Sequence, residues 1–150
     1  MTDSKADAET ARQLAMAGEL RVLVGRLKRR LQEEASVGDL TPSQVSALRQ
    51  LWESGPATVT TLARAEGVRP QSMGATIAAL DVLGLVSGSP DPDDGRQTIL
   101  SLTPACRKLI KDGRAAREDW LFRTIRKKLS PREQETLAGG IRLLERLLET

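Results

Sequence analysis

Histidine is absent from the 150-residue chain, and cysteine occurs once, as Cys106. Without histidine the chain has no imidazole for a Ser-His-Asp triad or for a metal site. A single cysteine leaves no partner for an intrachain disulfide and no set of thiolates for zinc. The sequence also shows no phosphate-binding loop and no pair of nucleophile and base. We therefore expect a protein that is not an enzyme and that holds no metal and no cofactor.

Aromatic residues and long apolar runs are scarce as well. The chain has two tryptophans, one phenylalanine and no tyrosine, whereas leucine, alanine, arginine and glutamate are plentiful. This composition favours helices and argues against a β-sandwich or a β-barrel. No apolar run approaches the roughly 20 residues that cross a bilayer, and residues 1–7 are polar and acidic, unlike a signal peptide. We expect a cytoplasmic protein with no membrane partner.

The net charge is small, +3, but the charges are unevenly distributed. Between Arg107 and Arg132 the chain carries ten basic residues and three acidic ones. Such a stretch is either an electrostatic footprint for an anionic partner or a solvated helix face. Charge alone does not decide between these two interpretations.

Apolar residues recur at helical spacing in six segments of the chain. Capping boxes that begin at Thr41 and Ser130 mark the starts of the second and sixth helices. Two short strands, at 85–86 and 97–102, flank a loop rich in proline, aspartate and glycine, and so predict a β-hairpin whose tip projects into solvent. The helices are expected at 8–35, from Pro42 to Gly55, at 59–66, from Pro70 to Gly84, from Pro104 through Ile125, and from Pro131 through Leu148.

A tight turn at Gly67 joins the third and fourth helices and predicts a helix-turn-helix. The small side chain of Ala63 lets the two helices approach each other. Met73, Ile77 and Leu80 follow at steps of four and three, which marks the buried face of the fourth helix. Because the hairpin comes directly after this helix, the motif is predicted to be a winged helix.

Three segments around the predicted hairpin are distinctive: Leu-Asp-Val-Leu-Gly-Leu-Val at 80–86, Pro-Asp-Pro-Asp-Asp-Gly-Arg at 90–96 and Leu-Ser-Leu-Thr at 100–103. Through these segments the chain resembles the MarR (multiple antibiotic resistance regulator) family of bacterial transcription regulators. The order of the helices from residue 8 to 150 is similar to that of the family. The resemblance implies a mainly α fold of about six helices and a short β-hairpin wing.

The family resemblance also implies a division of labour along the chain. Residues 1–36 and 103–150 are expected to be dimerisation helices, and residues 37–102 the DNA-binding lobe. Two such lobes in a homodimer would bind a palindromic site on double-stranded DNA. The resemblance further implies a repressor that a small aromatic or anionic effector, or an oxidant, releases from its operator. The alternative is a winged-helix module that binds protein rather than DNA, which would explain why the recognition face carries little charge.

The exposed face of the fourth helix supplies the candidate base contacts. If Met73 faces inward, Gln71 and Ala75 point the other way, with Ser72 and Gly74 at the margins. Gln71 can bond bidentately to adenine, Ser72 can bond a base or a phosphate, and Ala75 offers a methyl group to thymine. Family members often carry larger or polar residues at positions 74 and 75. The small residues here either permit close approach or are simply tolerated.

Three arginines are the candidate contacts to the DNA backbone and to the minor groove. Arg69 stands just before the fourth helix and is expected to reach a phosphate or a guanine, and Arg64 lies on the third helix and is expected to reach a phosphate. Arg96, in the wing loop, matches the family arginine that enters the minor groove, where a narrow A·T-rich groove concentrates negative potential. Asp93 or Asp94 would hold its guanidinium group in a bidentate ion pair. Each of these arginines is otherwise a solvated surface residue.

Cys106, just inside the fifth helix, has two interpretations. Arg107 and the helix N-terminus would lower the pKa of its thiol and favour a redox role. Cysteine is also among the residues that are most often buried as a small hydrophobe, and the chain has no second cysteine to resolve a disulfide. We expect the structural role. Trp120 is expected to pack in a core, with an effector crevice nearby as the alternative.

Overall fold

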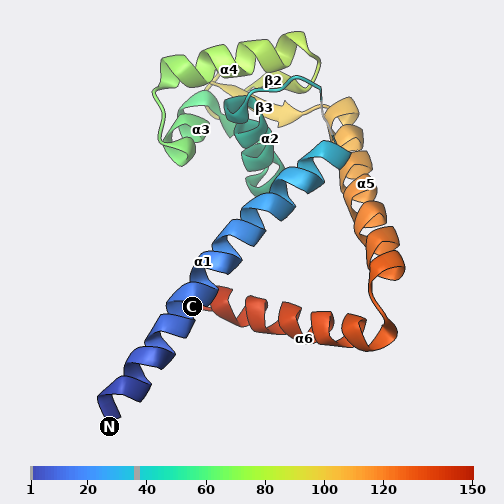
Figure 1. Ribbon diagram of the computed structural model, residues 1–150. Coiled ribbons are helices and arrows are strands. Elements are labelled where there is room, and N and C mark those ends of the chain that lie inside the picture. The colour runs from blue at the N-terminus through green and yellow to red at the C-terminus, as the bar shows by residue number, and fades with distance from the viewer. Residues whose placement is uncertain (1, 36–37) are drawn as a thin grey trace. The chain divides into compact units, whose positions relative to one another are not determined.

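The computed structural model describes residues 2–35 and 38–150. These residues form six helices and one small sheet (Figure 1). The six predicted helices and the predicted hairpin are confirmed. The elements are α1 (Thr2–Glu34), α2 (Pro42–Ser54), β1 (Ala57–Thr58), α3 (Val59–Glu66), α4 (Pro70–Val82), β2 (Val86–Pro90), β3 (Thr98–Leu102), α5 (Pro104–Lys128) and α6 (Pro131–Leu148).

The structure differs from the sequence prediction at three elements. Strand β2 runs from Val86 to Pro90 rather than over 85–86, because residues 87–90 pair with β3 although their composition is typical of a turn. Helix α1 begins at Thr2 rather than at residue 8. Residues 2–7 carry no apolar stripe, so helical periodicity could not extend the predicted helix over them. Strand β1, with two residues, was not predicted. It exists only because Ala57 and Thr58 pair with Leu100 and Ile99 of β3, and such pairing leaves no periodic signal in so short a segment.

The chain divides into two compact units, which are described separately. The winged unit is Ser36–Gly113, and the helical unit combines Met1–Ala35 with Arg114–Thr150. Helix α5 contributes to both, and Cys106 and Ile110 in its first turns pack into the winged unit. The predicted division of function at residue 103, with dimerisation helices on either side of a DNA-binding lobe, stays a prediction.

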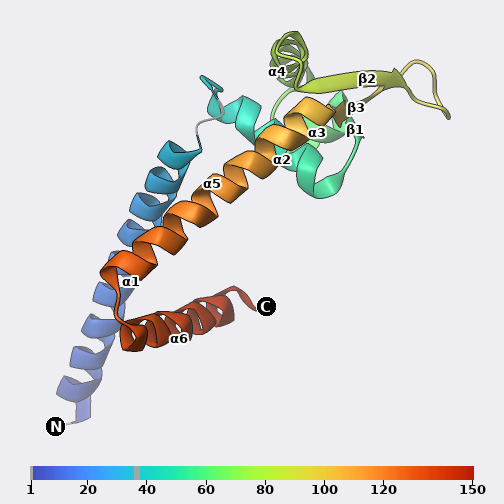
Figure 2. The same cartoon turned by 90° about the vertical axis from the view of Figure 1, so that its right-hand side faces the viewer.

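The winged unit closes one hydrophobic core. Helix α2 contributes three buried side chains, α3 contributes Leu62 and Ala63, and the sheet contributes Val86, Leu100 and Leu102. The three strands are antiparallel in the order β1-β3-β2, with Val86 opposite Leu102. Figure 2 shows that the β2–β3 hairpin extends beyond the helices of this unit and ends in a loop. The core therefore holds α4 and the wing as one scaffold.

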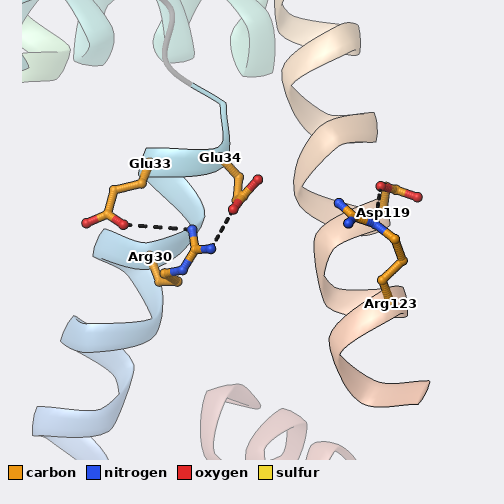
Figure 3. A network of polar contacts seen from close by, with 5 residues as sticks. All are labelled: Arg30, Glu33, Glu34, Asp119 and Arg123. Atoms are coloured by element: carbon orange, nitrogen blue, oxygen red, sulfur yellow. Dashed lines mark hydrogen bonds and ion pairs between the residues drawn. The ribbon is translucent and has the colours of Figure 1, made fainter. Parts of the chain in front are cut away.

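The helical unit has no comparable core. Within its described residues no side chain is buried. An interhelical contact comes from Arg30 of α1, whose guanidinium lies 4.5 Å from the ring centroid of Trp120 on α5. Arg30 also pairs with Glu34 at 2.6 Å and with Glu33 at 3.7 Å (Figure 3). Trp120 is therefore half-buried beneath an arginine rather than packed in an apolar interior.

Large apolar side chains lie exposed along two helices of the helical unit. Each is at least 39% exposed, although such residues usually occupy protein interiors. On α6 the spacing of Leu137, Ile141 and Leu144 places them on one helix face. The exposed set is Leu14, Met16, Val22, Leu23, Val24 and Leu27 on α1, and Leu137, Ile141, Leu143, Leu144, Leu147 and Leu148 on α6.

The two predicted capping boxes are confirmed. The Thr41 hydroxyl accepts a hydrogen bond from the backbone amide of Gln44, and the Gln44 side chain accepts one from the Thr41 amide. Ser130 and Glu133 repeat this pattern at the start of α6. Each box satisfies two of the amides that a helix N-terminus leaves unpaired. Among the described helices, none is long and apolar enough to cross a membrane.

Candidate nucleic-acid interface

Helices α3 and α4 form the predicted helix-turn-helix. The Thr58 hydroxyl caps α3 by accepting a hydrogen bond from the Thr61 amide. Gly67 ends α3 with φ +65, in the left-handed region that glycine enters without strain. The Val68 amide then donates to the Ala63 carbonyl at 2.9 Å, and Pro70 begins α4 at a position where its missing N–H costs nothing.

The structure confirms which face of α4 is buried. Met73 is 3% exposed, Ile77 6% and Leu80 0%. Gln71, Ser72 and Ala75 lie exposed, as the helical spacing predicted. In the part of the chain that the structure describes, the side chains of Gln71 and Ser72 have no hydrogen-bond partner. The amide and the hydroxyl at the start of α4 are therefore available to an outside partner.

The two arginines beside this face are also exposed. Arg69 is the residue before α4, and its carbonyl accepts from the Met73 amide at 3.0 Å. Arg64 lies in the last turn of α3. Within residues 2–35 and 38–150, neither side chain forms an ion pair. Both arginines belong to the same compact unit as Gln71.

The wing is organised by backbone contacts of its own aspartates. The Asp94 carboxylate accepts from the Arg96 amide at 3.1 Å, and the Asp94 carbonyl accepts from the Gln97 amide. Asp91 Oδ1 accepts from the Asp93 amide at 2.9 Å, and the Asp91 amide donates to the Gln97 carbonyl. Asp91 was not singled out from sequence. The Asp-x-Asp pattern that favours such a turn would have indicated it.

One prediction about the wing is wrong in the structure. No ion pair joins the Arg96 guanidinium to Asp93 or Asp94 among the described residues. The Asp94 carboxylate instead binds the Arg96 backbone amide two residues ahead. The short side chain of Asp94 reaches this nearby amide easily, so its carboxylate accepts a hydrogen bond within the turn instead of pairing with the guanidinium. The Arg96 side chain is left exposed and unpaired within the wing.

Cys106 is buried in the core of the winged unit, with 1% exposure. Burial raises the pKa of its thiol above the ordinary value of 9.0, and the nearby Arg107 opposes that shift only in part. The thiol is therefore protonated at neutral pH and shielded from solvent. These properties favour the structural role over the redox role.

Helix α5 also fastens to the winged unit through polar contacts. The Thr103 hydroxyl donates to the Gly84 carbonyl at 2.7 Å, and the same oxygen accepts from the Cys106 amide. The Arg107 guanidinium lies 5.9 Å from the Trp52 ring centroid on α2. Trp52 packs against the core. The first turns of α5 are thus anchored beside the helix-turn-helix.

The sequence and the fold both match known proteins. The MarR family model matches residues 40–98. An uncharacterised HTH-type transcriptional regulator of Mycobacterium bovis is 35% identical over 134 residues, which cover 89% of this chain and 93% of the relative. The chain belongs to the MarR family. A similar regulator of Mycobacterium leprae is 38% identical over 110 residues, covering 73% of this chain and 77% of that protein.

Solved structures support the membership. A transcriptional regulator from Pseudomonas aeruginosa is 33% identical to this MarR-family chain, with a TM-score of 0.80 and coverage of 93% and 97% of the two chains. A mutant of Staphylococcus aureus MepR bound to an oligodeoxyribonucleotide shares the fold at 20% identity, with a TM-score of 0.69 and coverage of 89% and 98%. The protein is thus a DNA-binding winged helix-turn-helix transcription regulator, and not an enzyme.

Proposed function

We propose that this MarR-family regulator is a homodimeric repressor that binds a palindromic operator and is released from it by a small aromatic or anionic ligand. The observation that carries the DNA-binding part is the arrangement of the winged unit. Unpaired Gln71 and Ser72 lie exposed at the start of α4, and the same compact unit carries three exposed arginines on α3, before α4 and in the wing that form no ion pair among the described residues. Polar reading groups flanked by cations are what a DNA-binding surface requires.

The proposed contacts follow from this arrangement. Gln71, Ser72 and Ala75 read base edges in the major groove, where each base pair shows a distinct pattern. Arg64 and Arg69 bind phosphates, which adds affinity without sequence preference. Arg96 inserts into the adjacent minor groove. The oligodeoxyribonucleotide bound to the S. aureus protein of the same fold supports this mode of use.

The homodimer is supported by the composition of the helical unit. Its described residues include no buried side chain, yet α1 and α6 expose two rows of large apolar residues. A second copy of the chain, presenting the same rows, would cover them in an isologous interface. Two lobes related by a two-fold axis would then read half-sites about 34–36 Å apart. The operator would be palindromic because the dimer that binds it has two-fold symmetry.

Release by a ligand is the part of the proposal that rests on family membership. A ligand shifts the protein away from DNA only by its differential affinity for the bound and free states. The corresponding test titrates small aromatic carboxylates into the protein–operator complex. A compound that lowers operator affinity, and that binds more weakly when operator is present, meets the requirement of reciprocal coupling.

The central experiment selects bound sequences from random duplex DNA with the purified full chain, at about 150 mM salt so that nonspecific binding is reduced. Analytical ultracentrifugation on the same sample establishes the oligomeric state. We expect an enriched palindrome whose half-sites are one helical turn apart, and a dimer. Affinity for the selected duplex should fall steeply with salt, since phosphate contacts release counterions.

Other results would lead elsewhere. A folded dimer that enriches no sequence, and whose binding is insensitive to salt, would replace the repressor by a protein-interaction module. Enrichment of a single non-repeated site by a monomer would remove the palindromic operator and the dimer. Reporter transcription that rises when the protein is added would contradict repression while leaving DNA binding in place.

A further inference from the structure

Thr103 differs from the other hydroxyl residues that cap helices in the described chain. Its hydroxyl accepts from the Cys106 amide at 3.1 Å, as a cap of α5 does, and it also donates to the Gly84 carbonyl at 2.7 Å, 19 residues earlier. One side chain thus joins the start of α5 to the end of α4. The capping hydroxyls that form hydrogen bonds only within their own N-cap are those of Thr41, Thr58 and Ser130.

The contact between the end of α4 and Thr103 is made at two points. The Thr103 amide donates to the Leu85 carbonyl at 3.1 Å, and its hydroxyl binds the carbonyl of the preceding Gly84. Gly84 is itself fixed to α4, because its amide donates to the Asp81 carbonyl at 2.9 Å and its φ of +72 ends the helix. Two hydrogen bonds to consecutive carbonyls define a direction, whereas one defines only a distance.

Helix α5 leads from this contact out of the winged unit. It is continuous from Pro104 to Lys128 and crosses the division between the two units after Gly113. Cys106 and Ile110 hold its first turns in the core of the winged unit. The later turns belong to the unit whose exposed apolar rows the proposed dimer covers. Since a helix is a rigid element, it carries a direction that is set at one end to the other.

We propose that Thr103 is a positioning residue for operator recognition, whose hydroxyl fixes the end of α4 to α5 and thereby the separation of the two recognition helices in the dimer. This inference rests on the proposed homodimer and its palindromic operator. Without the bridge to Gly84, the core still holds α5, but the end of α4 is tied to Thr103 by one hydrogen bond and can turn. The dimer then accepts a wider range of half-site spacings.

The test is a substitution series at Thr103 in the full-length protein. Thr103→Ser keeps both hydrogen bonds of the hydroxyl, and Thr103→Val keeps neither. Thr103→Asp separates the two, because a carboxylate caps a helix well but cannot donate to the Gly84 carbonyl. Each variant is titrated with the palindrome that the wild type selects and with a duplex that has one base pair inserted between the half-sites. The measured quantity is the ratio of the two affinities, in which a general change of phosphate attraction cancels.

Thr41→Val is the matched control. It removes the capping hydroxyl of α2, which lies in the same winged unit and binds only the Gln44 amide. Thermal unfolding of each variant measures the loss of stability. Thr41→Val and Thr103→Val should both lower the unfolding midpoint by about 4–8 °C, the shift expected when one N-cap is lost.

The expected results separate spacing from stability. The wild type and Thr103→Ser should bind the inserted duplex about a hundredfold more weakly than the palindrome, since a displaced half-site loses the gain from linked binding. In Thr103→Asp and Thr103→Val this ratio should fall to about tenfold. Thr41→Val should keep the ratio of the wild type. If Thr103→Val does not fold, Thr103→Asp carries the test, because it keeps the cap.

Four results overturn the inference. A wild-type ratio in Thr103→Asp would mean that the bridge to Gly84 does not set the spacing. A lowered ratio in Thr103→Ser would mean that the hydroxyl is not the cause, and a lowered ratio in Thr41→Val would assign the effect to lost stability. A wild type that binds both duplexes equally would leave no spacing to be set.

The proposed function stands in all four cases, because the wild type still selects a palindrome. A wild type that selects no palindrome overturns the proposed function together with the role of Thr103.

Discussion

At Arg96 the backbone is held in position by a hydrogen bond, while the side chain makes no described contact. The Asp94 carboxylate fixes the Arg96 amide, while the guanidinium is exposed and unpaired among the described residues. We predict that Arg96→Ala weakens operator binding by roughly tenfold to a hundredfold, the range of one good groove contact. The thermal midpoint should not change, because the side chain supports no described contact. Fluorescence anisotropy with the selected duplex measures the affinity.

Arg96→Lys is the control for this prediction. It keeps the charge but loses the planar group that fits a narrow groove. We expect it to recover the salt dependence of binding and only part of the affinity. Equal affinity of Arg96→Ala and the wild type would remove the wing from DNA recognition.

Cys106 gives a prediction about pH at the scale of one residue. Burial raises the pKa of its thiol above 9.0, so above that pH an unfolded chain loses this proton while the folded chain keeps it. The folded state then binds more protons than the unfolded state, and the free energy of unfolding falls as pH rises through 9.0. Denaturant titrations at increasing pH should show this decline, and Cys106→Ala should show less of it.

A second readout separates burial from reactivity at Cys106. Alkylation by iodoacetamide at neutral pH should be on the order of a hundredfold slower in the folded protein than in denaturant, since labelling must wait for opening of the core. Rapid labelling of the native protein would restore the redox interpretation.

At the scale of the element, the capping box of α6 couples helix stability to acid. The Ser130 backbone amide donates to the Glu133 carboxylate at 2.9 Å and lowers the pKa of Glu133 below its ordinary value of 4.5. The charged Glu133 carboxylate therefore stabilises the helix above pH 4.5, and this contribution is lost as the pH falls through the lowered pKa. Helicity followed by circular dichroism in an acid titration should decline less steeply in Glu133→Gln than in the wild type.

Glu133→Gln is an informative variant because an amide oxygen still accepts the hydrogen bond but carries no charge. Glu135→Gln, on the same helix and outside the capping box, is the matched control and should titrate as the wild type does. If Glu133→Gln and Glu135→Gln have the same effect, the acid sensitivity does not arise from the cap.

The elements also show how far sequence patterns reach. Met73, Ile77 and Leu80 predicted the buried face of α4, because helical spacing depends on the chain alone. Strand β1 was beyond such reasoning, since its two residues become a strand only by pairing with β3. The predicted ion pair in the wing was wrong for a similar reason. The pattern placed aspartates beside Arg96, but only coordinates show that Asp94 binds the backbone amide rather than the guanidinium.

At the scale of the whole molecule, the two units differ in how far a single chain buries their apolar side chains. The described residues of the winged unit include thirteen that are buried in one cluster, so this unit can hold α4 and the wing in position without help. The described part of the helical unit buries none. Periodicity predicted the apolar stripes of α1 and α6, but it could not say what covers them, because a partner leaves no trace in the spacing of one chain.

Covering those stripes is what the proposed dimer does, and a charge placed on them should undo it. Leu144 lies on the apolar face of α6 and is 41% exposed in one chain. An aspartate there would be desolvated in a dimer, at a cost of several kcal/mol. We predict that Leu144→Asp shifts the protein from dimer to monomer and weakens operator binding by about a hundredfold or more, since two linked half-site contacts become independent.

Arg146→Asp is the matched control, because Arg146 lies on the opposite side of α6 from Leu144 by helical spacing and is exposed. It should remain a dimer in sedimentation velocity and bind the selected duplex with an affinity close to that of the wild type. The winged unit of Leu144→Asp should keep its cooperative unfolding, because its core lies elsewhere in the chain. A Leu144→Asp protein that stays dimeric would place the interface off this face of α6, and α1 with its own exposed row would be the next surface to test.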